Sequence, residues 1–350
     1  MHMADALISP AVGVTMWVAT AGVAAYSIKK IQDDMDEKKI PLMGVMGAFV
    51  FAAQMINFTI PGTGSSGHLG GGLLLAILLG PYAGFLTMAA VLTIQALFFA
   101  DGGLLALGAN IFNLGFFTCF LVYPIIYKPL IAKGYSPKRI LGVALLAAVI
   151  GLQLGSFGVV LETLFSGKTE LPFYTFLLLM QPIHLAIGIV EGLVIAAVVT
   201  FVWKERPEIL ENASRGERLG SISLKRVITV FALAAVLTGG VFSWFASSNP
   251  DGLEWSMYKT SGLEELEAPE GIHQVFADLQ SKIAFLPDYG FKASGEESTP
   301  TTAESSEVWP VVDSGTTTAG IVGAGLTLAL AGIVGFGVTL LKKRNSNSAR

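Results

Sequence analysis

Long apolar runs, separated by short polar connections, make up most of this chain. A helix that crosses the hydrocarbon core of a bilayer needs about 20 predominantly apolar residues. Runs of this kind occur at residues 10–28, 41–58, 104–127, 140–165, 172–203, 227–246 and 319–341. The pattern therefore predicts seven membrane-spanning α-helices at these positions.

The stretch between residues 68 and 100 is also almost wholly apolar, but Gly80-Pro81-Tyr82 interrupts it. Proline is tolerated in the first turn of a helix, so a new helix is expected to begin at Pro81. Two helices are predicted here, over 69–79 and 81–100. The first is too short to cross the core alone, at ~1.5 Å of rise per residue. The total is nine spans in an all-α integral membrane protein.

Most lysine and arginine residues fall into four groups along the chain, and in short loops such residues mark the cytoplasmic side. The groups lie at residues 29–39, 128–139, 204–226 and 342–344. The alternate connections are 59–67, 101–103, 166–171 and 247–318, and in the short ones Lys168 is the one basic residue. Nine spans in the cell membrane, with the N-terminus outside and the C-terminus in the cytoplasm, place every basic group on the cytoplasmic face.

Composition supports the membrane assignment and excludes several classes of protein. The 350 residues are 53% hydrophobic and 14% charged, with a mean hydropathy of +0.64, whereas a soluble domain is about 25% charged. A soluble enzyme could not cover its surface with so few charges. The 22 basic and 26 acidic residues leave a net charge of −4, not the basic excess of a nucleic-acid-binding protein. The single cysteine, Cys119, excludes a disulfide framework and a cysteine-rich metal site.

Charge and loop length divide the chain into two blocks. Residues 1–205 form a seven-span block with tight loops, and residues 206–226 form a charged cytoplasmic linker. Residues 227–350 form a second block, in which two spans flank an acidic extracytoplasmic segment, 247–318. The predicted architecture is therefore a seven-span helical bundle joined to two further transmembrane helices.

The first two residues carry three nitrogen donors in succession. There is no lysine or arginine before Lys29, so the start does not have the basic region of a secretory signal, and we expect it to remain uncleaved. The Met1 amine and the His2 amide nitrogen close a five-membered chelate ring on a metal ion. The amide nitrogen and Nδ1 of His2 close a six-membered ring. A planar nitrogen set favours Ni²⁺ or Cu²⁺ over tetrahedral Zn²⁺.

His68 is the natural fourth nitrogen ligand. It ends the glycine-rich outside loop 61–68, where glycines allow the backbone to fold inward and approach an ion. Either histidine alone could be an ordinary terminal or loop residue. Two of four histidines on one face, one of them beside a free amine, favour a shared metal site formed by Met1, His2 and His68. Affinity should fall at acid pH, because these donors must lose protons to bind an ion.

Polar residues inside the predicted spans are open to other interpretations. Glu162 and Glu191 are intramembrane carboxylates and therefore candidates for function. Glu162 lies near the outer end of its helix, where extension of the side chain toward water would also account for it. His184 is expected to be a hydrogen-bonded packing or relay residue. His273 lies in the acidic outside segment and has no assigned role.

Three short stretches carry a family resemblance. Met1-His2 followed by ADALISP at residues 4–10, and GHLGGG at residues 67–72, resemble the CbiM/NikM family. These proteins are the substrate-binding (S) components of energy-coupling factor (ECF) transporters for cobalt and nickel, and they have a seven-span core. PDGLE at residues 250–254 resembles the family's small N-component. The chain therefore looks like a fusion of the two, and the resemblance covers nearly its whole length.

The resemblance implies a ligand set and a set of partners. In the family, the metal is held by the Met1 amine, the backbone nitrogen and imidazole of His2, and a histidine that matches His68. An ECF coupling transmembrane subunit and cytoplasmic ABC ATPase subunits are also implied, since this chain has no complete phosphate-binding loop. Ala21 and Ala25 have the spacing of small residues that contact the coupling subunit, although small residues are common in spans. We also expect an outside loop of the second block to touch the metal-loading mouth.

The implied function is capture of Ni²⁺, or Co²⁺, from outside for ATP-driven uptake, by a chain that is not itself an enzyme. The ion is the transported substrate, and a planar four-nitrogen site favours nickel. One alternative is a self-sufficient ion-coupled transporter or channel, with Glu162, Glu191, His184 or Gln153 lining its path. Another is a membrane sensor or assembly factor that docks partners on segment 247–318. In each case the chain is expected to lie in the lipid bilayer, and no nucleic-acid partner is expected.

Overall fold

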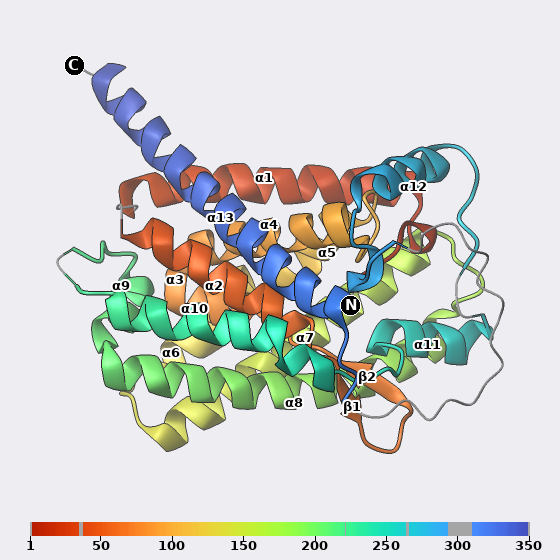
Figure 1. The fold of residues 1–350 in the computed structure, drawn as a ribbon, viewed down its shortest axis with the longest axis horizontal. Coiled ribbons are helices and arrows are strands. Elements are labelled where there is room, and N and C mark those ends of the chain that lie inside the picture. Colours follow the sequence, from red (N-terminus) through yellow and green to blue (C-terminus); the bar gives the residue numbers. More distant parts are fainter. Residues whose placement is uncertain (1, 35–37, 221, 264–265, 293–309, 349–350) are drawn as a thin grey trace.

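The computed structural model describes residues 2–34, 38–220, 222–263, 266–292 and 310–348, so Met1 lies outside the described part. The apolar runs form helices, most of which lie along one common direction (Figure 1). The first of these elements are α1 (Pro10–Asp34), α2 (Lys39–Gln54), β1 (Phe58–Ile60), β2 (Ser65–Gly67), α3 (Gly72–Leu79) and α4 (Pro81–Phe99).

The first block continues as one long helix and two still longer ones. These are α5 (Leu107–Ile111) running through the π-helical segment η2 (Phe112–Tyr127) into α6 (Lys128–Ile131), then α7 (Pro137–Phe165) and α8 (Phe173–Glu205). The short α9 (Pro207–Arg215) leads to the second block. That block contains α10 (Lys225–Gly240), α11 (Gly252–Ser261), α12 (Ile272–Ile283) and α13 (Ser314–Ser348). Short 3₁₀ turns are η1 (Asp5–Leu7), η3 (Phe242–Phe245) and η4 (Pro287–Tyr289).

Within the described ranges, six helices are long and apolar enough to cross a membrane, which confirms the predicted all-α membrane fold. They are Pro10–Gln32, Pro81–Phe99, Leu107–Ile131, Pro137–Phe165, Phe173–Glu205 and Ser314–Lys342. α2 and α10 have 16 residues each, and α3 has 8. At ~1.5 Å per residue α3 is much shorter than the ~30 Å hydrocarbon core. The count of nine spans therefore stays a prediction.

The break between α3 and α4 lies where the sequence predicts it. Gly80 has φ +83°, a conformation that residues with a Cβ rarely adopt, and Pro81 begins α4. The predicted end of the second span is less accurate. α2 stops at Gln54, because the chain then turns into the antiparallel β1–β2 hairpin, in which Phe58 pairs with Gly67.

The second block packs lengthwise against α2 of the first block. Both α10 and α13 contact α2, and α13 also contacts α4 (Figure 1). The helices approach closely through glycine: a Cβ at Gly323 would lie 2.0 Å from Cζ of Phe51. α10 and α13 meet in the same way, where a Cβ at Gly320 would lie 2.1 Å from the carbonyl oxygen of Gly239. The two blocks thus form a single packed bundle.

Short elements of both blocks gather at one end of this bundle. There α12 contacts η1 and α4, while α11 contacts β2 and α8. Figure 1 shows this end opposite α9. The amino-terminal segment and the glycine-rich loop therefore lie at the same end of the molecule, together with α11 and α12 of the second block.

Candidate metal centre

The amino-terminal segment turns inward and is held by its backbone. The N–H of Met3 donates to Oδ1 of Asn110 (2.8 Å), and Nδ2 of Asn110 donates back to the Met3 carbonyl oxygen (3.1 Å). The N–H of Gly103 donates to the same carbonyl oxygen (2.9 Å). The side chains of Met3, Leu7 and Ile8 are buried. These contacts fix the position of the residue just before Met3, which is His2.

Two ionisable side chains hold the rest of the segment. Oδ1 of Asp5 accepts the backbone N–H of Ala106 (3.0 Å), and burial raises the pKa of Asp5 above its ordinary value. His273, on α12 of the second block, contacts the carbonyl oxygen of Ile8 through Nε2 (2.9 Å) and is 2% exposed. His273, for which the sequence suggested no role, therefore joins the second block to the amino-terminal segment.

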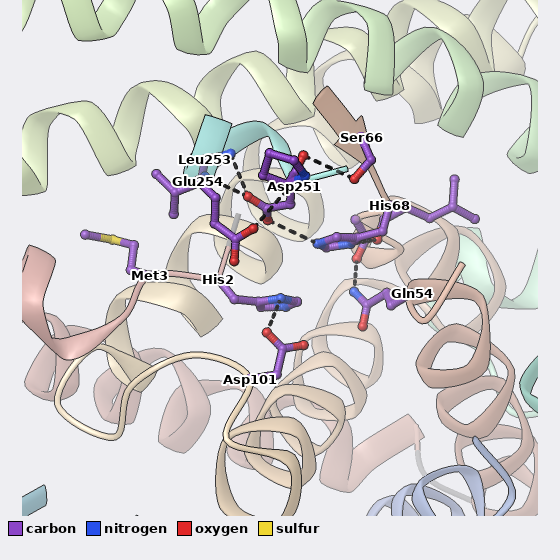
Figure 2. Close-up of polar contacts among 12 residues, drawn as sticks. His2, Met3, Gln54, Ser66, His68, Asp101, Asp251, Leu253 and Glu254 are labelled. Atoms are coloured by element: carbon purple, nitrogen blue, oxygen red, sulfur yellow. Dashed lines mark hydrogen bonds and ion pairs between the residues drawn. The ribbon is translucent and has the colours of Figure 1, made fainter. Parts of the chain in front are cut away.

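The structure brings His2 and His68 together. Their imidazole rings are stacked, with centroids 4.9 Å apart and planes at 5° to each other (Figure 2). The side chains are 6% and 9% exposed. Met1, the third residue of the predicted site, lies outside the described residues. Among the described residues no group of three or more His, Cys, Asp or Glu side chains is placed to hold a metal ion, so this site would need backbone or amine donors.

In each imidazole, Nδ1 faces an oxygen acceptor. Nδ1 of His2 lies 3.0 Å from Oδ1 of Asp101, and Nδ1 of His68 lies 3.0 Å from the Leu69 carbonyl oxygen. Nε2 of His68 faces Oδ2 of Asp251 at 4.0 Å. Nε2 of His2 is buried and has no hydrogen-bond partner within the described ranges. Carboxylate and carbonyl partners of this kind orient histidines that bind metals.

Burial and neighbouring charges set the protonation of these groups. Burial lowers the pKa of His68 to about 3, and the nearby His2 imidazole adds to the lowering. Burial opposes ionisation of Asp101, but His2 and the Tyr289 hydroxyl outweigh it and hold the pKa at about 2. Burial would raise the pKa of Asp251. Neighbouring groups, among them His68 and the backbone N–H of Glu254, outweigh burial and hold this pKa below its ordinary value. The site thus combines a neutral imidazole with two ionised carboxylates, which attract a divalent cation.

Three helices of the first block fix the glycines that follow His68. The Glu191 carboxylate on α8 accepts the N–H groups of Gly70 (2.8 Å) and Gly71 (3.1 Å). Gln54, at the end of α2, donates to the Gly70 carbonyl oxygen (2.8 Å), and Gln95 on α4 donates to Oε1 of Gln54 (3.0 Å). The structure therefore gives Glu191 a loop-holding role.

The PDGLE motif lies directly against the glycine-rich loop. The backbone N–H of Ser66 donates to the Pro250 carbonyl oxygen (2.8 Å). Oδ1 of Asp251 accepts two N–H groups from the first turn of α11 and caps that helix. The other carboxylate oxygen faces His68 (Figure 2). One oxygen of Asp251 therefore stabilises the motif, and the other faces the candidate site.

A second contact between the blocks reaches Asp101. The Tyr289 hydroxyl donates a hydrogen bond to Oδ2 of Asp101, and the Tyr289 ring stacks on Phe99 with centroids 5.1 Å apart. Nε2 of Gln280, on α12, donates to the Gly102 carbonyl oxygen (2.7 Å). The second block therefore contacts both loops that surround the paired imidazoles.

Two other predicted residues are buried and hydrogen bonded. Nδ1 of His184 lies 2.8 Å from the Met180 carbonyl oxygen, and its ring lines a small cavity that His68 also lines. Glu162 is 6% exposed and accepts a hydrogen bond from Nδ2 of Asn113 (2.8 Å). The interpretation that Glu162 extends toward water is therefore wrong, because a neighbouring helix supplies its partner.

The small residues of α1 lie on its outer side. Ala21 and Ala25 are both exposed. Thr20, the neighbouring residue, instead points into the bundle and donates its hydroxyl to the Gly108 carbonyl oxygen (2.7 Å). The face that carries Ala21 and Ala25 is therefore directed away from the bundle.

Sequence reasoning missed Asp101, Asp251 and Tyr289 as neighbours of the candidate ligands. Asp101 begins a glycine corner on the same predicted face as His68, and this was a usable signal. Asp251 belongs to the PDGLE motif, which by itself does not indicate contact with His68. Tyr289 lies 188 positions from Asp101, and only packing brings the two together.

Comparisons with known proteins identify both blocks. Residues 2–209 match the CbiM family model, described as the cobalt uptake substrate-specific transmembrane region, and residues 225–340 match the PDGLE domain. The relative named "Putative fused nickel transport protein NikMN", from Archaeoglobus fulgidus, is 34% identical over 94% of this chain and 96% of its own length. "Cobalt transport protein CbiM" from Geobacter sulfurreducens is 30% identical over 67% of this chain and 68% of its own length.

A solved structure of a transition metal transporter is also similar. It is 30% identical in sequence, with a TM-score of 0.52, and the match covers 61% of this chain and 99% of that one. The family model spans more than half of this chain, and the relatives are named as transport proteins rather than as enzymes. The chain therefore belongs to the CbiM family of cobalt-uptake substrate-specific transmembrane regions, as a multi-pass membrane component of cobalt and nickel transport that also carries a PDGLE domain.

Proposed function

We propose that this chain is the substrate-binding component of an energy-coupling factor transporter and captures Ni²⁺, or Co²⁺, outside the cell for ATP-driven uptake. The observation that carries the proposal is the buried, stacked pair of His2 and His68, 4.9 Å apart, at the end of the bundle where the amino-terminal segment turns inward. The names of relatives as nickel and cobalt transport proteins support the choice of ion.

Four nitrogens would hold the ion. With Met1 as the first residue, its amine and the His2 backbone nitrogen close a five-membered chelate ring, and Nδ1 of His2 closes a six-membered one. His68 supplies the fourth nitrogen. Asn110 fixes the backbone of Met3 on both sides, which supports the placement of His2 beside His68. A planar set of four nitrogens favours Ni²⁺ over ions that prefer tetrahedral sites.

The stacked rings must move for both to bind one ion. A ring nitrogen binds an ion that lies in the plane of its ring, and two stacked parallel planes do not share such a point. At least one imidazole therefore tilts when the ion enters. The PDGLE motif, held against Ser66 through Pro250, already lies beside the site and would keep the glycine-rich loop in place while the rings adjust.

Transport requires partners and a direction. The end of the bundle that holds the histidine pair would face outside. The opposite end, where the loops rich in lysine and arginine lie, would face the cytoplasm. The outward face of α1, with Ala21 and Ala25, would pack against the ECF coupling transmembrane subunit through its small residues. Cytoplasmic ABC ATPase subunits would supply the energy.

Titration of the purified chain with Ni²⁺ and Co²⁺ at neutral pH tests the capture step. The expected result is a yellow, diamagnetic Ni²⁺ complex that is lost in both His2→Ala and His68→Ala. A leader peptide added before Met1 tests the amine, because it converts the amine to an amide and should abolish binding. Removing that leader with a protease that leaves Met1 first is the matched control and should restore binding. Binding that survives both histidine substitutions would overturn the proposed site.

Reconstitution in lipid vesicles tests the energy source. Uptake of Ni²⁺ should require the coupling subunit, the ATPase subunits and ATP together with this chain. Uptake by this chain alone, without ATP, would contradict the ECF mechanism and favour a self-sufficient transporter.

A further inference from the structure

Asp101 is held between a candidate ligand and the second block. Its Oδ1 lies 3.0 Å from Nδ1 of His2, and its Oδ2 accepts the hydroxyl hydrogen bond of Tyr289. The Tyr289 ring is itself stacked on Phe99. The next residue, Gly102, is held through its carbonyl oxygen by Gln280 (2.7 Å). The carboxylate therefore has a fixed position next to the His2 imidazole.

The proposed chelate and this arrangement make different demands on Nδ1 of His2. A nitrogen that binds a metal ion directs a lone pair at it. An ionised carboxylate is only an acceptor, so the nitrogen that faces Asp101 at 3.0 Å carries a proton. One atom cannot do both. The other ring nitrogen, Nε2, is buried and without a hydrogen-bond partner in the described part of the chain.

A half-turn of the imidazole about its Cβ–Cγ bond removes this conflict. The half-turn exchanges the positions of Nδ1 and Cδ2, and those of Nε2 and Cε1. Nε2 then lies on the side of Asp101, while Nδ1 points away from the carboxylate. The proton on Nδ1 leaves to water and a proton from water binds Nε2, so the number of protons on the ring does not change. One carboxylate can therefore serve as the partner of both ring orientations.

We propose that Asp101 is a positioning residue for metal capture, which accepts a hydrogen bond from Nδ1 of His2 before the ion binds and from Nε2 of His2 afterwards. Tyr289 holds the carboxylate in place during this exchange and so gives the PDGLE block a direct part in capture. This inference rests on the proposed function, because it takes Nδ1 of His2 to be a ligand of the ion.

Histidine spectra test the exchange directly. The chain has four histidines, so labelling with ¹⁵N-histidine gives a nitrogen spectrum simple enough to assign with single His substitutions. The His2 proton is expected on Nδ1 without added metal and on Nε2 in the diamagnetic Ni²⁺ complex, with Nδ1 shifted by coordination. A His2 ring that keeps its proton on Nδ1 in the Ni²⁺ complex would overturn the inference.

Affinity measurements test the role of the carboxylate. Asp101→Asn should lower Ni²⁺ affinity by about 10–100-fold, the usual effect of losing a carboxylate that orients a metal-binding histidine. Tyr289→Phe keeps the stacked ring and removes the hydroxyl, and should lower affinity less. Tyr174→Phe, which removes the hydroxyl of a side chain that is 78% exposed, is the matched control and should bind normally. Unchanged affinity in Asp101→Asn would overturn the inference.

The outcomes separate this inference from the proposed function. Failure of the unmodified protein to bind Ni²⁺, or full binding by His2→Ala, would reject the proposed site itself. Loss of binding in His2→Ala together with normal binding in Asp101→Asn would reject only the role of Asp101. If Asp101→Asn does not fold, Tyr289→Phe and the histidine spectra of the unmodified protein still decide the question.

Discussion

The backbone N–H of Ser66 donates a 2.8 Å hydrogen bond to the carbonyl oxygen of Pro250, a residue 184 positions away. This bond joins the glycine-rich loop of the CbiM region to the PDGLE motif. The next residue of the motif, Asp251, then faces His68 at 4.0 Å. A loop whose backbone is paired in this way has fewer conformations, so the contact restrains His68, one of the proposed ligands.

Replacing Asp251 with alanine removes both the cap of α11 and the carboxylate that faces His68. Loss of the cap should lower the free energy of unfolding by about 1 kcal/mol. Loss of the carboxylate should in addition weaken Ni²⁺ binding, measured by titration calorimetry. Asp313→Ala is the matched control, because Oδ2 of Asp313 accepts the N–H of Thr316 in the first turn of α13. Equal affinities in the two variants would show that Asp251 has no part in binding.

The stability of the protein should fall as the pH is lowered below about 6.5. The pKa of His68 is about 3 in the folded protein, against an ordinary value of 6.5. Between these values the unfolded chain binds a proton that the folded chain does not, so the free energy of unfolding decreases as the pH falls. Thermal unfolding in detergent at pH 7.5 and pH 5.5 measures the effect. The decrease should be smaller in His68→Gln, and an identical decrease in both proteins would contradict the burial of a neutral His68.

Glu191→Ala should speed the release of bound Ni²⁺. The substitution leaves the N–H groups of Gly70 and Gly71 without their acceptor, at a cost of about 1–3 kcal/mol for each buried group. The loop that carries His68 is then less firmly held, and the dissociation rate in the presence of excess chelator should rise about tenfold. Glu162→Ala is the control, since it removes another buried carboxylate, which contacts Asn113 instead of the loop. Equal release rates in the two variants would reject the loop-holding role.

Packing between the blocks should be sensitive to a side chain at Gly323. A Cβ there would meet Phe51 at 2.0 Å, so Gly323→Leu should push α13 away from α2, lower the thermal stability and weaken the contacts of the PDGLE motif. Gly325→Leu, two positions further along the same helix, is the matched control, because a Cβ at Gly325 meets no atom within 4 Å. Normal Ni²⁺ binding by a destabilised Gly323→Leu protein would show that capture does not depend on tight packing between α13 and α2.

Most of the fold follows from local sequence. The lengths of the apolar runs predict the long helices, and Gly80-Pro81 marks the break between α3 and α4. The β1–β2 hairpin does not follow, because three-residue strands have no periodic pattern to detect. The partner of Glu162 was also hidden, since position along a helix does not reveal which residue of the next helix lies opposite.

The candidate site divides in the same way. Chelate chemistry predicts that His2 and His68 belong together, and the structure places them in contact. Their carboxylate partners depend on packing between segments far apart in the chain. The contact of Asp101 with Tyr289 requires η4 to lie against the end of α4, and no local pattern records that arrangement.

The packing of α10 and α13 along α2 has a consequence for stoichiometry. Because both blocks belong to one polypeptide, the PDGLE motif reaches the glycine-rich loop in an intramolecular step. Tethering of this kind gives effective concentrations on the order of millimolar for short linkers. Each copy of the chain therefore carries one PDGLE motif for its own His2 and His68. The contact between the motif and the glycine-rich loop does not depend on how much of a second protein the cell produces.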